Sequence, residues 1–169
     1  MESSLYLDLP PFDPEELLKC LKKLILMDQS WFPPEPYYSR DISQLYVRLA
    51  HISTDDKLGI RTASKSRIFA ILNPLTFKYK KLRLKCSKDH FKNWPLGHGS
   101  YRLGGNVGPL SPFIRDAKNN GFDDVLWLLD GYIKEMTFIN VFVLVKSRFG
   151  HLELITPPND GCVFNGSLR

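Results

Sequence analysis

Residues 100–108 are the strongest candidate for chemistry in the sequence, because two adjacent glycines stand between a cationic and an amide side chain. Gly104 and Gly105 carry no Cβ, so their backbone can lie close to a ligand or to another segment of the chain. Arg102 and Asn106 flank them and supply hydrogen-bond donors. Glycine pairs also occur in plain connecting loops, so this pattern leaves both interpretations open.

The other residue types that carry out chemistry are scattered along the chain. The histidines form no recognisable catalytic pattern with a cysteine or a carboxylate: His51, His90, His98 and His151. The cysteines are odd in number and include no Cys-x-x-Cys pair: Cys20, Cys86 and Cys162. We therefore expect reduced thiols, no zinc or other metal site, and an intracellular protein.

Composition indicates a folded, basic protein. The 169 residues suffice for one domain or two small ones, and 43% hydrophobic with 12% aromatic residues supply a buried core. The net charge is +5, and basic residues gather in residues 78–85 and at Lys88, His90 and Lys92. Such a patch can bind nucleic acid, but its alternation with leucine favours the solvent-exposed face of a strand. We expect no nucleic-acid partner.

Targeting signals are not visible in the sequence. The first residues show neither a secretory signal nor an arginine-rich presequence. No apolar run approaches the roughly 18 residues that a membrane span needs. The sequence therefore predicts a soluble, cytoplasmic protein that has no membrane partner.

The elements that must position these residues begin with an amphipathic helix over about residues 14–28. Asp13 can accept hydrogen bonds as the N-cap, Pro14 suits the first helical position, and Glu16 stands at the third. Apolar residues then recur at helical spacing: Leu17, Leu21, Leu24 and Ile25. This leucine face is expected to pack in the core, with partner binding as the alternative.

Three strands are expected next. Residues 44–50 alternate, with Leu45, Val47 and Leu49 on one face and Tyr46 and Arg48 on the other. Residues 67–72 are almost continuously apolar, which predicts a strand buried on both faces. Residues 81–86 alternate between apolar and mostly basic side chains, which predicts a half-exposed strand.

The second half predicts a helix and further strands. Ser111 and Pro112 can start a helix that stops at residues 119–121. A core strand at residues 124–129 is followed by the hairpin turn Asp130-Gly131 and a returning strand at residues 132–136. Residues 138–145 are the most apolar segment of the chain, Gly150 separates them from residues 152–155, and another turn is expected at residues 156–161. Strands with only two helices among them indicate an α+β fold.

The glycine motif resembles a known signature. Residues 101–107, Tyr-Arg-Leu-Gly-Gly-Asn-Val, are similar to Tyr-Lys-Leu-Gly-Gly-Asn-Tyr, which surrounds the lysine that carries pyridoxal phosphate in branched-chain amino acid aminotransferases. Residues 12–20, 45–48, 125–128 and 156–161 resemble further segments of that family in the same order. The resemblance covers almost the whole chain and is therefore far more specific than any single motif.

The resemblance implies the fold-type IV pyridoxal-phosphate architecture, with mixed sheets, few helices and an active site between two domains of a dimer. In family terms, residues 1–92 would be the later part of the small domain, and residues 93–99 an interdomain loop. Residues 100–169 would be the earlier part of the large domain. The chain would therefore be a truncated form, which leaves strand edges and apolar faces uncovered unless it docks onto another subunit.

Position 102 decides the expected activity. The family's lysine condenses with the aldehyde of pyridoxal phosphate and later moves a proton between substrate and cofactor. Arg102 replaces it, and a guanidinium stays protonated with its lone pairs delocalised. Arg102 would neither form the covalent link nor act as a base, so no intact catalytic residue is expected.

The resemblance also implies the remaining site residues. Glu135 would hold the pyridine nitrogen of pyridoxal phosphate, and Gly166, Ser167 and Leu168 would belong to the phosphate cup. Leu168 lacks the hydroxyl of the family's threonine, and Val107 lacks that of its second tyrosine. On the substrate side the matching residues are Tyr46 and Arg48. For Glu135, Tyr46 and Arg48, the solvated face of a strand is the alternative interpretation.

We therefore expect a catalytically inactive chain of the aminotransferase family, a pseudoenzyme. Its relatives' reaction is amino transfer from leucine, isoleucine or valine to 2-oxoglutarate. Pyridoxal phosphate is the implied cofactor, without covalent attachment. The implied partner is a second copy of the chain or a full-length homologue, and modulation of such an intact subunit is the alternative function.

Overall fold

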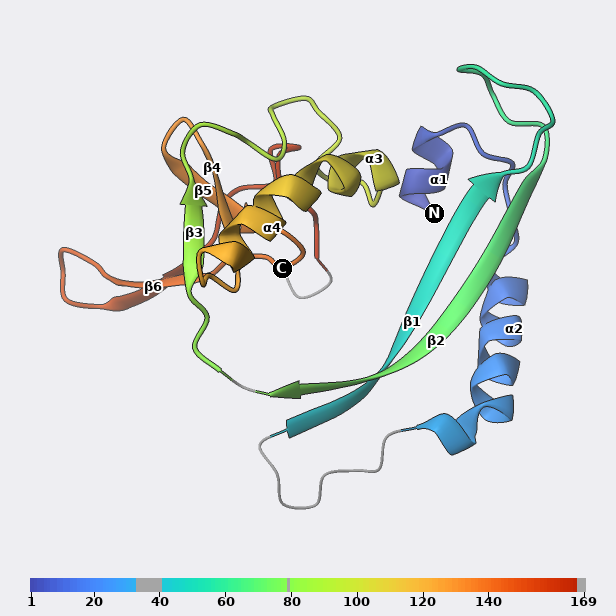
Figure 1. The fold of residues 1–169 in the computed structure, drawn as a ribbon, viewed down its shortest axis with the longest axis horizontal. Coiled ribbons are helices and arrows are strands. Elements are labelled where there is room, and N and C mark those ends of the chain that lie inside the picture. Colours follow the sequence, from blue (N-terminus) through green and yellow to red (C-terminus); the bar gives the residue numbers. More distant parts are fainter. Residues whose placement is uncertain (33–40, 79, 167–169) are drawn as a thin grey trace. The chain divides into compact units, whose positions relative to one another are not determined.

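The computed structural model describes residues 1–32, 41–78 and 80–166. They form two compact units, Met1–Lys80 and Lys81–Arg169, each of which is described by itself (Figure 1). The boundary comes earlier in the chain than the interdomain loop expected at residues 93–99, because residues 84–87 pair with a strand of the second unit. The assignment of the units to a small and a large domain of the family stays a prediction.

The first unit begins with two helices, α1 (Glu2–Tyr6) and α2 (Pro14–Met27), followed by the short 3-10 helix η1 (Gln29–Trp31). The N-cap of α2 is the predicted one, since Asp13 Oδ1 accepts from the N–H groups of Glu15 at 2.8 Å and Glu16 at 3.3 Å. The predicted apolar stripe of Leu17, Leu21, Leu24 and Ile25 is half-buried. The helix prediction for residues 14–28 is confirmed.

A long antiparallel ribbon completes the first unit. Strand β1 (Asp41–Ser53) pairs along its whole length with β2 (Ser66–Lys78). The helical segment contacts one face of this ribbon: the ring of Phe12 lies edge-on to that of His51 at 5.4 Å, and Trp31 lines a small pocket together with Leu45 and Leu72. The predicted strands 44–50 and 67–72 are therefore both present.

The prediction that residues 67–72 are buried on both faces is wrong. Ile68, Ala70 and Leu72 are half-buried, whereas Phe69 and Ile71 on the alternate face are 41% and 50% exposed. A ribbon of two strands gains cover only from what packs against it, and the helical segment of this unit covers one face. The apolar side chains on the second face of this strand are therefore exposed, because no described element of the unit covers that face.

The second unit is built on the three-stranded sheet β3-β4-β5. Strand β3 (Leu84–Ser87) runs parallel to β4 (Asp124–Leu129), which pairs antiparallel with β5 (Tyr132–Met136). The β4–β5 turn places Asp130 at φ 52° and Gly131 at φ 80°, as the Asp-Gly pair predicted. Strands β6 (Val143–Lys146) and β7 (Leu152–Ile155) form a separate hairpin.

The chain connects β3 to β4 through a loop and three helical segments: α3 (Gly104–Val107), η2 (Gly108–Leu110) and α4 (Ser111–Asn119). Helix α4 packs on β4, where Ala117, Val125 and Trp127 are the buried centre of the core. The predicted helix from Ser111 and the predicted core strand are confirmed. The described structure is the expected α+β arrangement of mixed sheets with few helices.

One strand prediction in the second unit needs correction. The strand expected at residues 81–86 begins only at Leu84, and Leu82 is 43% exposed. Among the described residues β3 pairs with β4 alone, from Asp124 onward. Within the apolar segment 138–145, a strand begins at Val143. None of the helices in the described part of the chain is long and apolar enough to cross a membrane.

Candidate functional site

Glu135 is the centre of the candidate site in the second unit. It lies on β5 opposite Trp127 of β4, and only 2% of its surface is exposed. A carboxylate buried to this extent needs hydrogen bonds and a counter-charge, because transfer of an ion out of water is costly. The structure therefore contradicts the alternative interpretation of Glu135 as a solvated strand residue.

The counter-charge is Lys92, from the loop after β3. Its Nζ lies 2.7 Å from Glu135 Oε1 and also donates to the carbonyl oxygen of Thr137 at 2.8 Å. The Lys92 side chain is 8% exposed, so both members of the ion pair are buried. Neighbouring Asn93 donates from Nδ2 to Glu135 Oε1 at 3.4 Å and to the Cys162 carbonyl oxygen at 3.1 Å.

The other oxygen of Glu135 holds the C-terminal segment. The backbone N–H of Phe164 donates to Glu135 Oε2 at 3.1 Å, and Asn140 Nδ2 donates to the Phe164 carbonyl oxygen at 2.8 Å. Gly166 follows, and a Cβ at this position would collide with Asn140 Oδ1. A side chain at Gly166 would therefore require the Asn140 side chain to move, and the link of this segment to Glu135 is the Phe164 N–H.

Arg102 packs against this same segment. Its guanidinium carbon lies 3.5 Å from the centroid of the Phe164 ring, within the range of a cation–π contact. The residue at the position of the family's lysine is therefore placed beside the segment that Glu135 holds. Arg102, Glu135 and Gly166, three of the residues that the sequence singled out, each contact Phe164.

The glycine pair itself is not packed against another described segment, as in the connecting-loop interpretation that the sequence left open. A Cβ at Gly104 or Gly105 would meet no described atom within 4 Å. Asn106 instead closes the loop, since its Nδ2 donates to the carbonyl oxygens of His98 at 2.7 Å and Tyr101 at 3.2 Å. The close approach is found at Gly99, where a Cβ would lie 2.5 Å from the Gly161 carbonyl oxygen.

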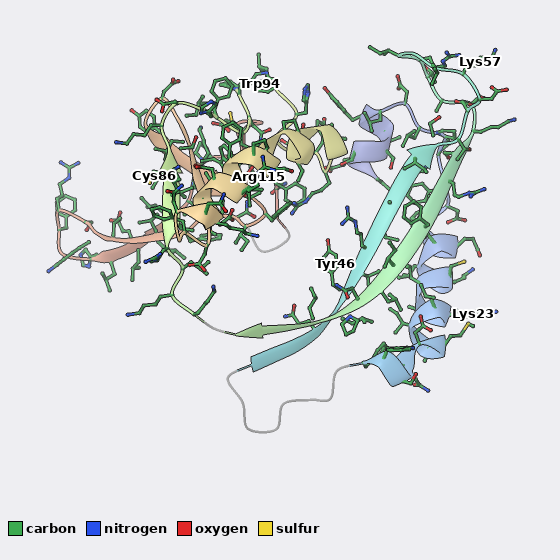
Figure 2. All side chains as sticks on the ribbon, viewed as in Figure 1. Lys23, Tyr46, Lys57, Cys86, Trp94 and Arg115 are labelled. Carbon is green, nitrogen blue, oxygen red and sulfur yellow. The ribbon has the colours of Figure 1, made fainter. Side chains whose placement is uncertain are left out.

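Tyr46 lies on β1 in the first unit (Figure 2). Arg48 lies two residues further along β1 and is exposed as well. Tyr46 is 51% exposed and lies opposite Asn73 of β2, while Arg48 lies opposite Ile71. Exposure in the unit by itself is compatible with both interpretations, so the substrate-side role of Tyr46 and Arg48 stays a prediction. Ser167 and Leu168, the remaining predicted site residues, lie outside the described residues.

An ion pair stabilises the turn beside the buried carboxylate. Lys134 Nζ lies 2.6 Å from Asp160 Oδ2, and the Cys162 N–H donates to Asp160 Oδ1 at 3.0 Å. Burial acts to raise the pKa of Asp160, but these hydrogen bonds outweigh it and leave the pKa below its ordinary value. Burial, together with the hydrogen bond to Asp160, raises the pKa of the Cys162 thiol, which is 1% exposed.

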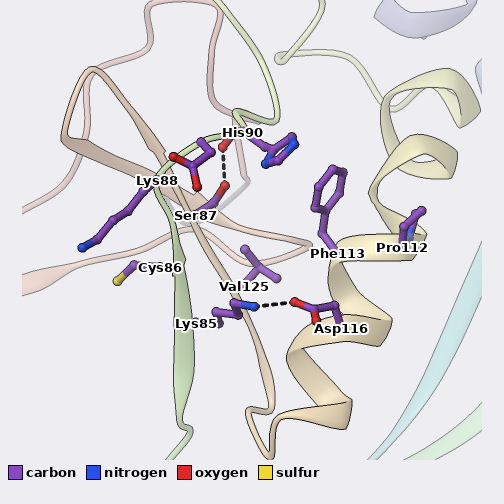
Figure 3. A pocket seen from close by; sticks show the side chains of 10 residues that line it. Lys85, Cys86, Ser87, Lys88, His90, Pro112, Phe113, Asp116 and Val125 are labelled. Atoms are coloured by element: carbon purple, nitrogen blue, oxygen red, sulfur yellow. Dashed lines mark hydrogen bonds and ion pairs between the residues drawn. The ribbon is translucent and has the colours of Figure 1, made fainter.

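A separate pocket of about 400 Å³ lies between β3 and α4 (Figure 3). Lys85 and Asp116 pair with each other across it, and Phe113 and Val125 supply apolar lining. None of the described site residues that the resemblance implies lines it. Among the described residues, no group of three or more histidine, cysteine or acidic side chains is placed to hold a metal ion.

Sequence reasoning did not find Lys92, Asn93 or the Phe164 N–H as partners of Glu135. Lys92 was visible only as a member of a loose basic group, and a backbone N–H carries no sequence signal. The usable signal was Glu135 itself, because an acid that is buried requires a cation. Lys92 is the lysine that the fold brings to Glu135, whereas Lys134 of β5 pairs with Asp160.

Comparison with solved structures defines the class of fold. An aminotransferase from Brucella abortus bound to the cofactor PLP matches 98% of this chain and 55% of its own chain, with a TM-score of 0.73 and 19% identity. A branched-chain amino acid aminotransferase from a T.th. strain matches 96% of this chain and 49% of its own, with a TM-score of 0.68 and 21% identity. The fold is thus part of the fold-type IV aminotransferase architecture, as expected.

Comparison with curated sequences defines the family. The mitochondrial branched-chain-amino-acid aminotransferase of Bos taurus is 35% identical over all of this chain, and the cytosolic one of Mus musculus is 36% identical over 95%. No protein-family profile matches. The chain belongs to the branched-chain aminotransferase family, and it spans 44% and 42% of these two relatives.

Pyridoxal phosphate is the cofactor that the family resemblance implies, and the described residues do not fit it as a lysine-linked group. Arg102 offers no amine that condenses with an aldehyde. Glu135 is almost fully buried and already accepts hydrogen bonds from Lys92, Asn93 and Phe164. No catalytic step is therefore derived through the cofactor.

Proposed function

We propose that this chain is a catalytically silent member of the branched-chain aminotransferase family, a pseudoenzyme. The reaction it would have lost is amino transfer from leucine, isoleucine or valine to 2-oxoglutarate. The observation that carries the proposal is Arg102 at the lysine position, with its guanidinium against the Phe164 ring. A cation that never releases its proton near neutral pH supplies neither a nucleophile nor a base.

The cofactor and substrate residues follow from the same proposal. Pyridoxal phosphate would bind weakly and without a covalent link, if it binds at all, because Glu135 is engaged within the chain. Tyr46 and Arg48 would be remnants of a substrate-binding face on β1. Residues 1–92 would correspond to the later small domain, 93–99 to the interdomain loop and 100–169 to the earlier large domain. The proposed location is the cytoplasm.

The matching experiment is a turnover assay with leucine, 2-oxoglutarate and pyridoxal phosphate, in which keto-acid formation is followed. The purified chain is expected to give no product above a blank, and Arg102→Lys alone is expected to stay inactive because Val107 lacks the hydroxyl of the family's tyrosine. A full-length relative serves as the positive control. Product formation by the unmodified chain, with contaminating enzyme excluded, would contradict the proposal.

A second candidate function is a partner that pairs with an intact aminotransferase subunit and modulates it. The observation that favours it is a set of large apolar side chains left exposed on the strands of both units: Phe69, Ile71, Leu144, Leu152 and Leu154. Exposed apolar surface of this kind marks interaction sites. Co-purification with a full-length homologue would support pairing, and a monodisperse monomer that leaves the homologue's rate unchanged would contradict it.

A further inference from the structure

The Lys92–Glu135 ion pair is buried to an extent that few ion pairs reach. The two side chains are 8% and 2% exposed, and their charged atoms lie 2.7 Å apart. The exposed ion pair Lys85–Asp116 of the same unit offers a contrast, with side chains 40% and 56% exposed. Exposed pairs contribute little to stability, whereas removing one partner of a buried pair leaves an uncompensated charge.

The hydrogen-bonding capacity of the Glu135 carboxylate is mostly used within the chain. A carboxylate offers about four lone-pair positions. Lys92 and Asn93 donate to Oε1 and the Phe164 N–H donates to Oε2, so three of these positions are taken. Lys92 also neutralises the negative charge of the carboxylate. Glu135 therefore keeps one acceptor position and no unpaired charge for a protonated ring nitrogen.

We infer that Lys92 takes, within this chain, the place on Glu135 that a cofactor's ring nitrogen would need, so that Glu135 serves to close the fold. The inference rests on the proposed function, because a chain that transaminates would need this carboxylate for its cofactor. The ion pair joins three segments: the loop of Lys92 and Asn93, strand β5, and the segment of Cys162 and Phe164. Arg102 then packs on the Phe164 ring of that last segment.

The test is a double-mutant cycle on unfolding of the second unit. A Trp31→Phe background removes the tryptophan of the first unit, so that Trp94 and Trp127 report on the second. Lys92→Met and Glu135→Leu are each expected to raise the unfolding equilibrium constant more than a hundredfold. The double variant is expected to recover most of that loss, since neither charge is then left unpaired.

The matched control is the same cycle on the exposed pair, with Lys85→Met and Asp116→Leu. There the coupling between the two changes is expected to stay below about fivefold. If the single variants at Lys92 and Glu135 do not fold while their double variant does, the inference is supported. A double variant that is no more stable than the worse single variant would overturn it.

Ligand binding supplies an independent readout, with pyridoxamine phosphate as the probe because it has no aldehyde. Glu135→Gln is expected to change its affinity less than twofold, or to leave an undetectable affinity undetectable. A saturable affinity that falls tenfold in Glu135→Gln would show that the carboxylate holds the ring, and would overturn the inference. Turnover by the unmodified chain would overturn the proposed function, whereas a failed stability cycle would overturn this inference alone.

Discussion

Arg102 differs from the family's lysine in the availability of a lone pair. A lysine that is buried or placed near other cations can lose its proton and attack a carbonyl carbon, whereas a guanidinium remains protonated at any pH that a protein survives. Arg102 contacts the ring of Phe164, and the backbone N–H of the same Phe164 donates to Glu135. This placement near Glu135 does not give the guanidinium a free lone pair. The proposed inactivity therefore rests on the chemistry of the side chain at position 102.

Asp160 makes a prediction about pH at the residue scale. Its pKa in the folded chain lies below the value of about 3.9 that an unfolded aspartate shows. A depressed pKa means that the ionised carboxylate stabilises the fold above about pH 4, and that this contribution is lost as the pH falls through the folded pKa. Asp160→Asn is expected to cost about 0.5–1.5 kcal/mol at pH 7.

The measurement is urea unfolding of wild type and Asp160→Asn from pH 7 to pH 2.5. The difference between the two free energies of unfolding is expected to shrink as the pH falls below about 4. Lys134→Met removes the partner of Asp160 and should show the same trend with a smaller amplitude. A difference that stays constant across the range would contradict the role given to this ion pair.

At the scale of elements, two glycines predict opposite outcomes for the same substitution. Gly99→Ala would place a Cβ 2.5 Å from the Gly161 carbonyl oxygen and 2.6 Å from the Cys162 carbonyl carbon, both backbone atoms. It is expected to destabilise the chain by about 1–3 kcal/mol or more. Gly105→Ala lies in α3 with open space around it and is expected to stabilise by about 0.4–1 kcal/mol.

Thermal or urea unfolding of the two variants beside wild type decides between them. Equal losses at Gly99 and Gly105 would mean that the glycine pair of the motif is held as tightly as Gly99, which would contradict the described packing. A neutral Gly99→Ala would contradict the close contact between the loop and the segment at Gly161 and Cys162.

Elements whose signal is local could be predicted from the sequence. The cap at Asp13, the Asp130-Gly131 turn and the helix from Ser111 depend on neighbouring residues, and each is present. Residues 67–72 were misjudged because burial depends on which elements cover a strand, and the run of apolar side chains does not record that. Lys92 was missed for the same reason, since its ion pair spans 43 residues of sequence.

At the scale of the whole molecule, the buried apolar residues are distributed unevenly between the two units. Every buried apolar residue of the described part of the chain belongs to Lys81–Arg169: Leu110, Ala117, Val125, Trp127, Met136, Cys162 and Val163. In the part of the ribbon whose side chains are described, residues 44–53 and 66–75, no residue is more than half-buried. Burial of apolar area contributes about 25 cal/mol for each Å² removed from water. The two units are therefore expected to differ in stability.

Amide hydrogen exchange of the intact chain measures this difference. The amides of β4, buried between β3 and β5, are expected to exchange at least tenfold more slowly than the cross-strand amides of β1 and β2. The amides of β6 and β7, whose side chains are largely exposed, provide an internal comparison within the second unit. Protection of β1 and β2 equal to that of β4 would show that something covers the ribbon, as docking onto a partner subunit would.

Position 102 carries no amine that could capture an aldehyde. Incubation with pyridoxal phosphate, reduction with borohydride and mapping of labelled peptides by mass spectrometry test this directly, with a full-length relative as the positive control. Wild type is expected to show no label on the peptide that contains position 102, and label is expected there only after Arg102→Lys. A stable, stoichiometric adduct at Arg102 in the unmodified chain would overturn the proposed inactivity.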